Sequence, residues 1–266
     1  MANQSHTVVY QSVKVLIDSR YRNDPTPINI SEFTYSLNRE IGRVSSVYVE
    51  SAQIPFTYYA VDFNSNNLIV VYNGVLYGAP MVRGNYNSGT ILTAVKQALD
   101  AMSIGGITWT VTFNPSTLKI TISMVGGVGV FSLVIQGDLD SVGPLLGFTV
   151  DAGPAAAITA DSALDLSGPR YLVIKSKLIG ENRAYPTAVS VLYSADVSSD
   201  AIIHTVPVNT NPGGVILDLV PEPRNNILGF KTAFQNDIDF RLEDDRGNLL
   251  NLNGGQWSMQ LTFELR

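Results

Sequence analysis

The sequence predicts an all-β fold with one flanking α-helix at about residues 90–103, and three observations support this prediction. The end of the chain alternates strictly between polar residues and apolar ones, the latter being Trp257, Met259, Leu261, Phe263 and Leu265. This alternation is typical of a strand with one buried and one solvated face. About ten short segments have strand-like patterns, and turn sequences separate them. Only one stretch has convincing helical periodicity.

The final strand must pair with another strand, and we expect its partner in the N-terminal part of the chain, where the pairing would close the fold. Just before it, Phe240 and Leu242 alternate with polar residues and lead into a turn at 244–248. Further strands are expected at 8–17, 28–37, 44–54, 130–135, 171–178 and 189–194.

Three pairs of segments have the pattern of β-hairpins. Residues 68–71 and 75–77 flank Asn73-Gly74, a sequence that tolerates the positive backbone angles of a two-residue turn. The other two pairs are 109–113 with 118–122, and 202–208 with 215–220. The glycine-rich run 126–129 has no Lys-Ser/Thr after it and precedes a strand pattern, so it predicts a turn or bulge rather than a phosphate-binding loop.

The predicted helix begins after a loop at 84–89. Its apolar residues fall on one face: Ile91, Leu92, Val95, Ala98, Leu99 and Met102. Packing on the flank of a sheet is the favoured interpretation of this face, and a groove for a partner is the alternative.

The composition bounds the function. The 266 residues are 45% apolar and 15% charged, so a sizeable core is expected. The low charge fits a chain that hides surface in other subunits, or an ordinary β-sandwich whose wet faces carry Ser, Thr and Asn. The net charge of −6 argues against strong nucleic-acid binding. Without cysteine, disulfides, thiolate nucleophiles and Cys-type zinc sites are excluded.

We expect residues 1–24 to form an N-terminal arm and connector, with a strand at about 8–17, and residues 25–266 to form one domain. No stretch is long or polar enough to indicate a further domain boundary. The first residues lack the basic and apolar regions of a signal peptide, and no apolar run approaches the roughly 18 residues of a membrane helix.

The sequence indicates no catalytic, cofactor-binding or metal-binding residue, and an enzyme is not expected. His6 and His204 have no metal-ligand spacing, and nothing supports a triad through His204. The acidic turn could hold calcium through Glu243, Asp244, Asp245 and Asn248, although Asp-rich turns are common for steric reasons. Two acid pairs could in principle serve a glycosidase, but solvated loop acids are the simpler interpretation: Asp161 with Asp165, and Asp196 with Asp200.

Two clusters are candidates for binding surfaces. Phe56, Tyr58 and Tyr59 could stack on sugars, but packing in the core or at a subunit contact is favoured. The other cluster comprises Lys14, Arg20 and Arg22, which could form a local basic patch with weak, salt-sensitive phosphate contacts.

Short motifs occur in a recognisable order along the chain. They are Asp-Ser-x-x-Arg at 18–22, Val-Tyr-Val-Glu-Ser-Ala-Gln-Ile-Pro at 47–55 with Tyr59 and Asn66-Asn67 after it, Gly-Asn-Tyr at 84–86, Leu-Leu-Gly-Phe at 145–148, Asp-Leu-Ser-Gly-Pro-Arg-Tyr at 165–171, and 247–257. This order resembles the penton and minor capsid proteins of large eukaryotic double-stranded DNA viruses and their virophages. The resemblance extends from about residue 15 to the end.

The resemblance implies an elaborated single jelly-roll β-sandwich and a structural capsid role, first of all as the penton that forms pentameric vertices by self-association. Its implied partners are further copies of itself, neighbouring major capsid protein capsomers and other minor capsid proteins, with no cofactor. The implied location is the virion, after synthesis in the host cytoplasm. The alternatives are a receptor- or glycan-binding module of a viral spike or fibre, and another minor capsid or cement protein.

Overall fold

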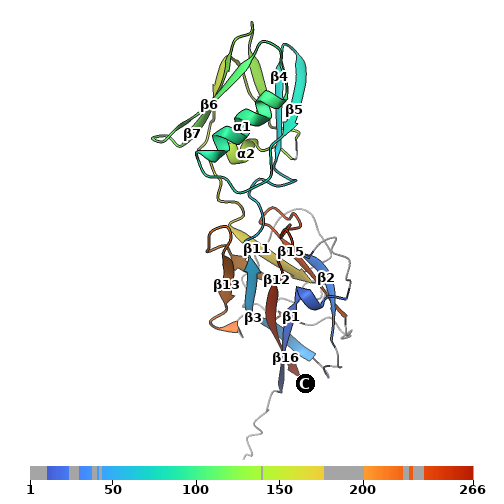
Figure 1. Cartoon of the computed structure of the whole chain (residues 1–266). Coiled ribbons are helices and arrows are strands. Elements are labelled where there is room, and N and C mark those ends of the chain that lie inside the picture. Colours follow the sequence, from blue (N-terminus) through green and yellow to red (C-terminus); the bar gives the residue numbers. More distant parts are fainter. Residues whose placement is uncertain are drawn as a thin grey trace, which may run out of the picture. The chain divides into compact units, whose positions relative to one another are not determined.

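The computed structural model describes residues 11–23, 30–37, 41, 44–138, 140–176, 201–223, 228–229 and 237–265 (Figure 1). The chain packs as two compact units. Unit 1 comprises Met1–Thr57 and Pro169–Arg266, and unit 2 comprises Tyr58–Gly168. The predicted strand at 189–194 lies outside the described residues, as do the first ten residues of the predicted arm.

Two antiparallel sheets make up the described part of unit 1. Sheet A has the order β1 (Ser12–Asp18), β16 (Ser258–Leu265), β3 (Val44–Pro55) and β13 (Val215–Leu219), and the short β14 (Leu228–Gly229) also pairs with β3. Sheet B has the order β12 (Ala201–Pro207), β11 (Tyr171–Ser176), β15 (Asp237–Glu243) and β2 (Glu32–Ser36).

The strand pairing in unit 1 is nested. The first strand pairs with the last, β2 pairs with β15, β3 with β13, and β11 with β12. A chain folded back on itself in this way, with the eight strands of these four pairs divided between two sheets, has the topology of a jelly roll. The predicted jelly-roll fold is therefore confirmed, and so is the pairing of the last strand with the N-terminal part of the chain.

The alternation in the last strand places its apolar face in the core of unit 1. Met259, Leu261 and Phe263 are buried, and they pair in register with Ile17, Val15 and Val13 of β1. In the core of unit 1, the rings of Trp257 and Phe33 pack edge to face, with their centroids 5.5 Å apart. These contacts explain why the strand with the clearest sequence pattern closes the fold.

Strand β3 contains a β-bulge that its sequence does not reveal. Gln260 pairs with Ser51 and Leu261 pairs with Val49, so Glu50 is the extra residue. The bulge reverses which side of the strand faces the core: Val49 is buried before it and Ala52 after it. This reversal accounts for the absence of a purely apolar face in the sequence of β3.

The third predicted hairpin is wrong. Residues 201–207 and 215–219 both form strands, but β12 pairs with β11 in sheet B whereas β13 pairs with β3 in sheet A. The turn sequence between them joins the two sheets instead of two neighbouring strands. Local turn residues indicate that the chain reverses direction, but they do not specify which strand becomes the partner.

Unit 2 is inserted between β3 and β11, and it is the elaboration of the jelly roll. One sheet has the order β5 (Val75–Pro80), β4 (Asn67–Tyr72), β8 (Phe131–Val134) and β9 (Ala152–Ala155). The other has the order β10 (Ala157–Thr159), β7 (Lys119–Val125) and β6 (Thr108–Asn114). Both predicted hairpins of this region, β4–β5 and β6–β7, are confirmed.

The predicted helix is α1 (Thr90–Ala101), which packs against β6 within unit 2 (Figure 1). Its buried residues are Ile91, Ala94, Val95, Ala98 and Leu99, so packing on the sheets rather than a partner groove is confirmed for this face. A second helix, the four-residue α2 (Gly143–Leu146), contains the start of the Leu-Leu-Gly-Phe motif. No helix in the described part of the chain is long and apolar enough to cross a membrane.

The two-unit packing adds a division inside the region that we predicted as one domain, residues 25–266. The chain first passes from unit 1 to unit 2 between Thr57 and Tyr58. Phe56 and Tyr58 are both buried, so no polar linker marks this boundary in the sequence. The predicted boundary at residues 24 and 25 lies outside the described residues and stays a prediction.

Candidate assembly surface

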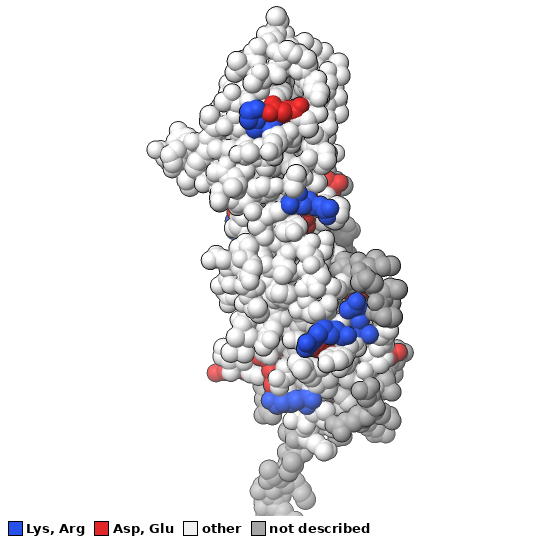
Figure 2. Space-filling view, viewed as in Figure 1, with Lys and Arg blue, Asp and Glu red and all other residues white. Residues whose placement is uncertain are grey.

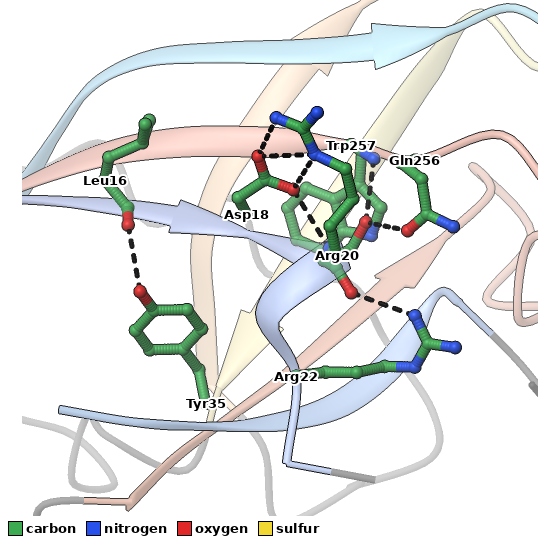
Figure 3. Close-up of polar contacts among 8 residues, drawn as sticks. Leu16, Asp18, Arg20, Arg22, Tyr35, Gln256 and Trp257 are labelled. Atoms are coloured by element: carbon green, nitrogen blue, oxygen red, sulfur yellow. Dashed lines mark hydrogen bonds and ion pairs between the residues drawn. The ribbon is translucent and has the colours of Figure 1, made fainter. Parts of the chain in front are cut away.

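The Asp-Ser-x-x-Arg motif forms a corner after β1, where the chain enters the single-turn helix η1 (Ser19–Tyr21) (Figure 3). The Asp18 carboxylate accepts a hydrogen bond from the backbone N–H of Arg20 at 2.9 Å. It also receives the Arg20 guanidinium, whose Nε lies 3.0 Å and 2.9 Å from the two oxygens. These hydrogen bonds from Arg20 hold the pKa of Asp18 below its ordinary value. The corner therefore fixes an exposed arginine in one position.

Ser19 fastens this corner to the last strand. Its backbone N–H donates to the Trp257 carbonyl at 3.0 Å, and its hydroxyl accepts from the Trp257 N–H at 3.0 Å. The same hydroxyl donates to the Gln256 side chain at 2.7 Å, and Arg22 donates to the Ser19 carbonyl at 2.9 Å (Figure 3). The motif thus has a structural role, joining the two ends of the jelly roll.

The surface of this corner is aromatic and cationic. Tyr21 is 70% exposed, and the Arg20 guanidinium lies 5.8 Å from its ring centroid. Leu16, on the outer side of β1, is also exposed. Tyrosine and arginine are the residues that contribute most often to the energy of protein interfaces. We refer to Leu16, Arg20 and Tyr21 as the β1 corner.

The opposite edge strand of sheet A exposes a row of apolar side chains. Val215, Leu217 and Leu219 of β13 are 59%, 46% and 64% exposed, whereas Ile216 between them is buried. A solvated strand face usually carries polar residues, so this row, the β13 stripe, is a candidate contact surface. The sequence predicts a strand at 215–220, but which of its two faces is buried depends on the pairing with β3.

Polar residues link three neighbouring strands between these two edges. The Glu50 carboxylate at the bulge accepts hydrogen bonds from Lys14 Nζ at 2.8 Å, Thr262 Oγ1 at 2.8 Å and Gln260 Nε2 at 2.6 Å. Burial would raise the pKa of Glu50, but the hydrogen bonds from Lys14 and Thr262 outweigh it, and the pKa is lowered. Sequence analysis missed this cluster because its members are distant along the chain.

The basic patch considered from the sequence is largely neutralised. Lys14 pairs with Glu50, Arg20 with Asp18, and Arg22 with a backbone carbonyl. In Figure 2 the blue side chains on unit 1 do not form one continuous field. These three residues therefore have local structural partners, which weakens the case for a phosphate-binding role.

The aromatic cluster is divided by burial. Phe56 and Tyr58 are 4% and 2% exposed, so packing is confirmed for them and they cannot offer their faces to a sugar. Only Tyr59 of the three reaches the surface. The structure does not bring these residues together as an exposed stacking platform.

The acidic candidates cap turns. Asp244 accepts hydrogen bonds from the backbone of Arg246 and Asn248, and Asp245 accepts one from the backbone of Arg170. Burial is the largest influence on Asp244 and raises its pKa. In the described ranges, no group of three or more His, Asp or Glu side chains is arranged to hold a metal ion.

The described acid pair, Asp161 and Asp165, is not arranged for glycoside hydrolysis. Asp161 accepts hydrogen bonds from the Thr149 side chain and backbone, which lower its pKa, whereas a general acid needs a raised one. Asp165 accepts two hydrogen bonds from Ser167. Asp196 and Asp200 lie outside the described residues.

His204 on β12 bonds through Nε2 to Asp218 on β13, and so connects the edges of the two sheets of unit 1. Among the described residues, no serine hydrogen-bonds to His204, so this pair does not form a triad. His6, the other candidate histidine, lies outside the described residues.

No family model and no curated protein matches the chain. Among solved structures, the chain is similar to the mavirus penton protein, with a TM-score of 0.48, 13% identity, and 96% of this chain and 99% of that chain covered. It is also similar to a chain of the Sputnik virophage, with a TM-score of 0.45, 11% identity, and coverages of 96% and 98%.

A third similar structure is the D2–D3 part of the flagellar cap protein FliD from Escherichia coli. Its TM-score is 0.23 at 9% identity, with 88% of this chain and 100% of that chain covered.

Proposed function

We propose that this chain is a structural capsid protein that self-associates into the pentameric penton of a virion vertex. The observation that carries the proposal is the presence of two different contact surfaces at opposite edges of one sheet. The β13 stripe lies on one edge strand of sheet A, and the β1 corner comprises Leu16 on the other edge strand with Arg20 and Tyr21 just after it.

A ring requires this kind of asymmetry. In a heterologous contact, one surface of a subunit meets a different surface of its neighbour, and the ring closes when the rotation between subunits divides a full turn. Two identical patches would instead favour a twofold dimer. In the proposed ring, the apolar β13 stripe of one copy packs against Leu16 and Tyr21 of the next.

The free energy gained by burying the stripe is enough to hold a ring together, although it is small for a single contact. Fully burying a valine or leucine side chain contributes about 1.5–3 kcal/mol. Because the three stripe residues are about half exposed, their burial would contribute roughly 2–4 kcal/mol at each contact. This amount is modest alone, but every subunit of a closed ring makes two such contacts.

The proposed role also includes the partners and the location that the resemblance implies. The pentamer would sit among major capsid protein capsomers and contact other minor capsid proteins, and its location would be the virion. The role requires no cofactor and no catalysis. A glycan-binding module is less well supported, because two of its three candidate aromatic residues are buried.

The double variant Leu217→Ser/Leu219→Ser tests the proposal. It removes apolar surface from the stripe and leaves buried Ile216 in place. We expect the pentamer to dissociate at concentrations where the unmodified chain remains assembled, as measured by native mass spectrometry. Tyr21→Ser on the opposite surface should have the same effect.

Val150→Ser is the matched control, because Val150 is an exposed valine of unit 2, outside both surfaces. It should leave the pentamer intact. Equal assembly by the stripe variant and the control, with both chains folded, would contradict the proposed contact.

A further inference from the structure

Three connections meet at one end of unit 2. Residue pairing brings Tyr72 beside both Val75 and Phe131, and Thr108 beside Val125. The turn 73–76, the loop 104–107 and the loop 125–130 therefore lie at the same end of the two sheets. We refer to these three segments as the unit 2 tip.

Two of the three tip segments, the turn 73–76 and the loop 125–130, expose large apolar side chains. Val128 is 89% exposed, and four others are between 44% and 63% exposed: Val75, Leu76, Val125 and Val130. Isolated exposed valines are ordinary on protein surfaces, but a group of five on adjacent turns marks an interaction site. Because turns project from the ends of strands, this apolar surface is convex.

Charge is absent from the segments that build the tip. Residues 63–82, 101–118 and 120–137 contain no Asp, Glu, Lys or Arg. Acidic residues lie at the other end of β4, where the Asn67 side chain donates to Asp138 at 3.0 Å. In Figure 2 the end of unit 2 at the top of the view is white. The nearest charges preceding loop 104–107, Lys96 and Asp100, neutralise each other at 2.6 Å.

Hydrogen bonds and close packing within the tip satisfy some of its polar groups without water. The Tyr72 hydroxyl donates a hydrogen bond to the carbonyl of Val128, the most exposed residue of the loop. Gly126 packs so closely that a Cβ there would lie 2.6 Å from the Gly106 carbonyl oxygen. The loops thus support each other through backbone contacts, with apolar side chains directed outward.

We propose that the unit 2 tip inserts into the interfacial layer of a lipid bilayer. A convex apolar surface built from segments without a charged residue fits a deformable, apolar partner. Charged groups are costly at depth in lipid, and the tip has none. The tip consists of turns and loops rather than a helix or a closed barrel, so insertion stops in the headgroup and upper acyl region.

The absence of charge also specifies the lipid. An anionic surface recruits proteins through Lys and Arg, with a strong dependence on salt. The tip binds through apolar contact alone, so neutral phosphatidylcholine bilayers suffice and binding is insensitive to ionic strength. This activity is separate from self-association, which the proposed function assigns to unit 1.

Flotation of the full chain with phosphatidylcholine vesicles tests the inference. We expect the chain to float with the vesicles at both low and high salt. Val128→Asp should reduce the vesicle-bound fraction at least tenfold, because it places a charge at the most exposed position of the tip. Val150→Asp, an equivalent change at an exposed valine outside the tip, should leave flotation unchanged.

A reporter variant adds a direct measure of depth. Both native tryptophans are buried, so Val128→Trp places an accessible indole in the tip. Quenching of the added fluorescence by brominated phosphatidylcholine is expected. Failure of the unmodified chain to float, or equal flotation by Val128→Asp, would overturn the inference, as would binding only to anionic vesicles. A change in oligomer mass on Val128→Asp without vesicle binding would assign the tip to a protein contact instead.

Discussion

Lys14 on β1 and Glu50 on β3 form an ion pair, 2.7 Å between Nζ and Oε1, across the strand that lies between them. The contact is possible because the bulge at Glu50 directs its carboxylate over Thr262 and Gln260 of β16. A single acidic side chain thus connects three strands at the centre of sheet A, between the two proposed contact surfaces.

This relationship predicts a pH dependence of stability. The folded-state pKa of Glu50 lies below its ordinary value of 4.5, so the folded state favours the carboxylate more than the unfolded state does. The stabilisation is therefore present above pH 4.5 and lost as the pH falls through the folded-state pKa. Thermal unfolding at pH 7 and pH 3 should show a smaller pH-induced loss of stability in Glu50→Gln than in the unmodified chain. An identical loss in both chains would contradict this.

Asp18→Ala should destabilise unit 1 by about 1–2 kcal/mol, because it removes both the cap of η1 and the charge that holds Arg20. Urea unfolding measures the effect. Lys96→Gln, which breaks an exposed pair within α1, should cost only about 0.5 kcal/mol. Similar costs for the two variants would show that the motif is an ordinary surface ion pair.

Trp257→Phe should cost about 1–3 kcal/mol, because the indole N–H donates to the Ile30 carbonyl at 3.1 Å and a phenyl ring would leave that carbonyl unpaired. Reduced packing against Phe33 adds to the loss. An unchanged unfolding midpoint, measured by circular dichroism, would argue against this arrangement of the core.

Gly147→Ala should be poorly tolerated. Gly147 ends α2 with φ of +88°, and an added Cβ would lie 2.4 Å from the Ser162 carbonyl oxygen. We expect a loss of about 2–4 kcal/mol, combining backbone strain with steric conflict. Gly74→Ala is the control, since φ is +77° there but no atom lies within 4 Å, and its cost should be about 1 kcal/mol. Equal costs would mean that Ser162 moves away freely.

The sequence predicted the elements of this fold better than their pairing. The alternation from Trp257 to Leu265 correctly identified the closing strand, and Asn73-Gly74 identified a hairpin turn with φ of 50° and 77°. These are local signals, since side-chain period and turn geometry depend on neighbouring residues. The partners of β12 and β13 were beyond such signals, because nested pairing joins strands far apart in sequence.

The candidate surface was predictable only in part. The Asp18–Arg22 motif stood out in the sequence, but the contacts of Ser19 with Trp257 required the closed sheet. The β13 stripe contains ordinary strand residues, and its exposure depends on which face β3 leaves open. The bulge at Glu50 left no sequence signal other than a strand with two mixed faces.

The mass of the purified chain in solution, measured by native mass spectrometry at low and high salt, tests the central claim most directly. The account predicts a dominant species near five times 28.8 kDa that loses subunits in Leu217→Ser/Leu219→Ser. Because the stripe is apolar, the pentamer should persist at high salt. A folded monomer at all concentrations, or a closed dimer or trimer unaffected by the stripe substitutions, would contradict it.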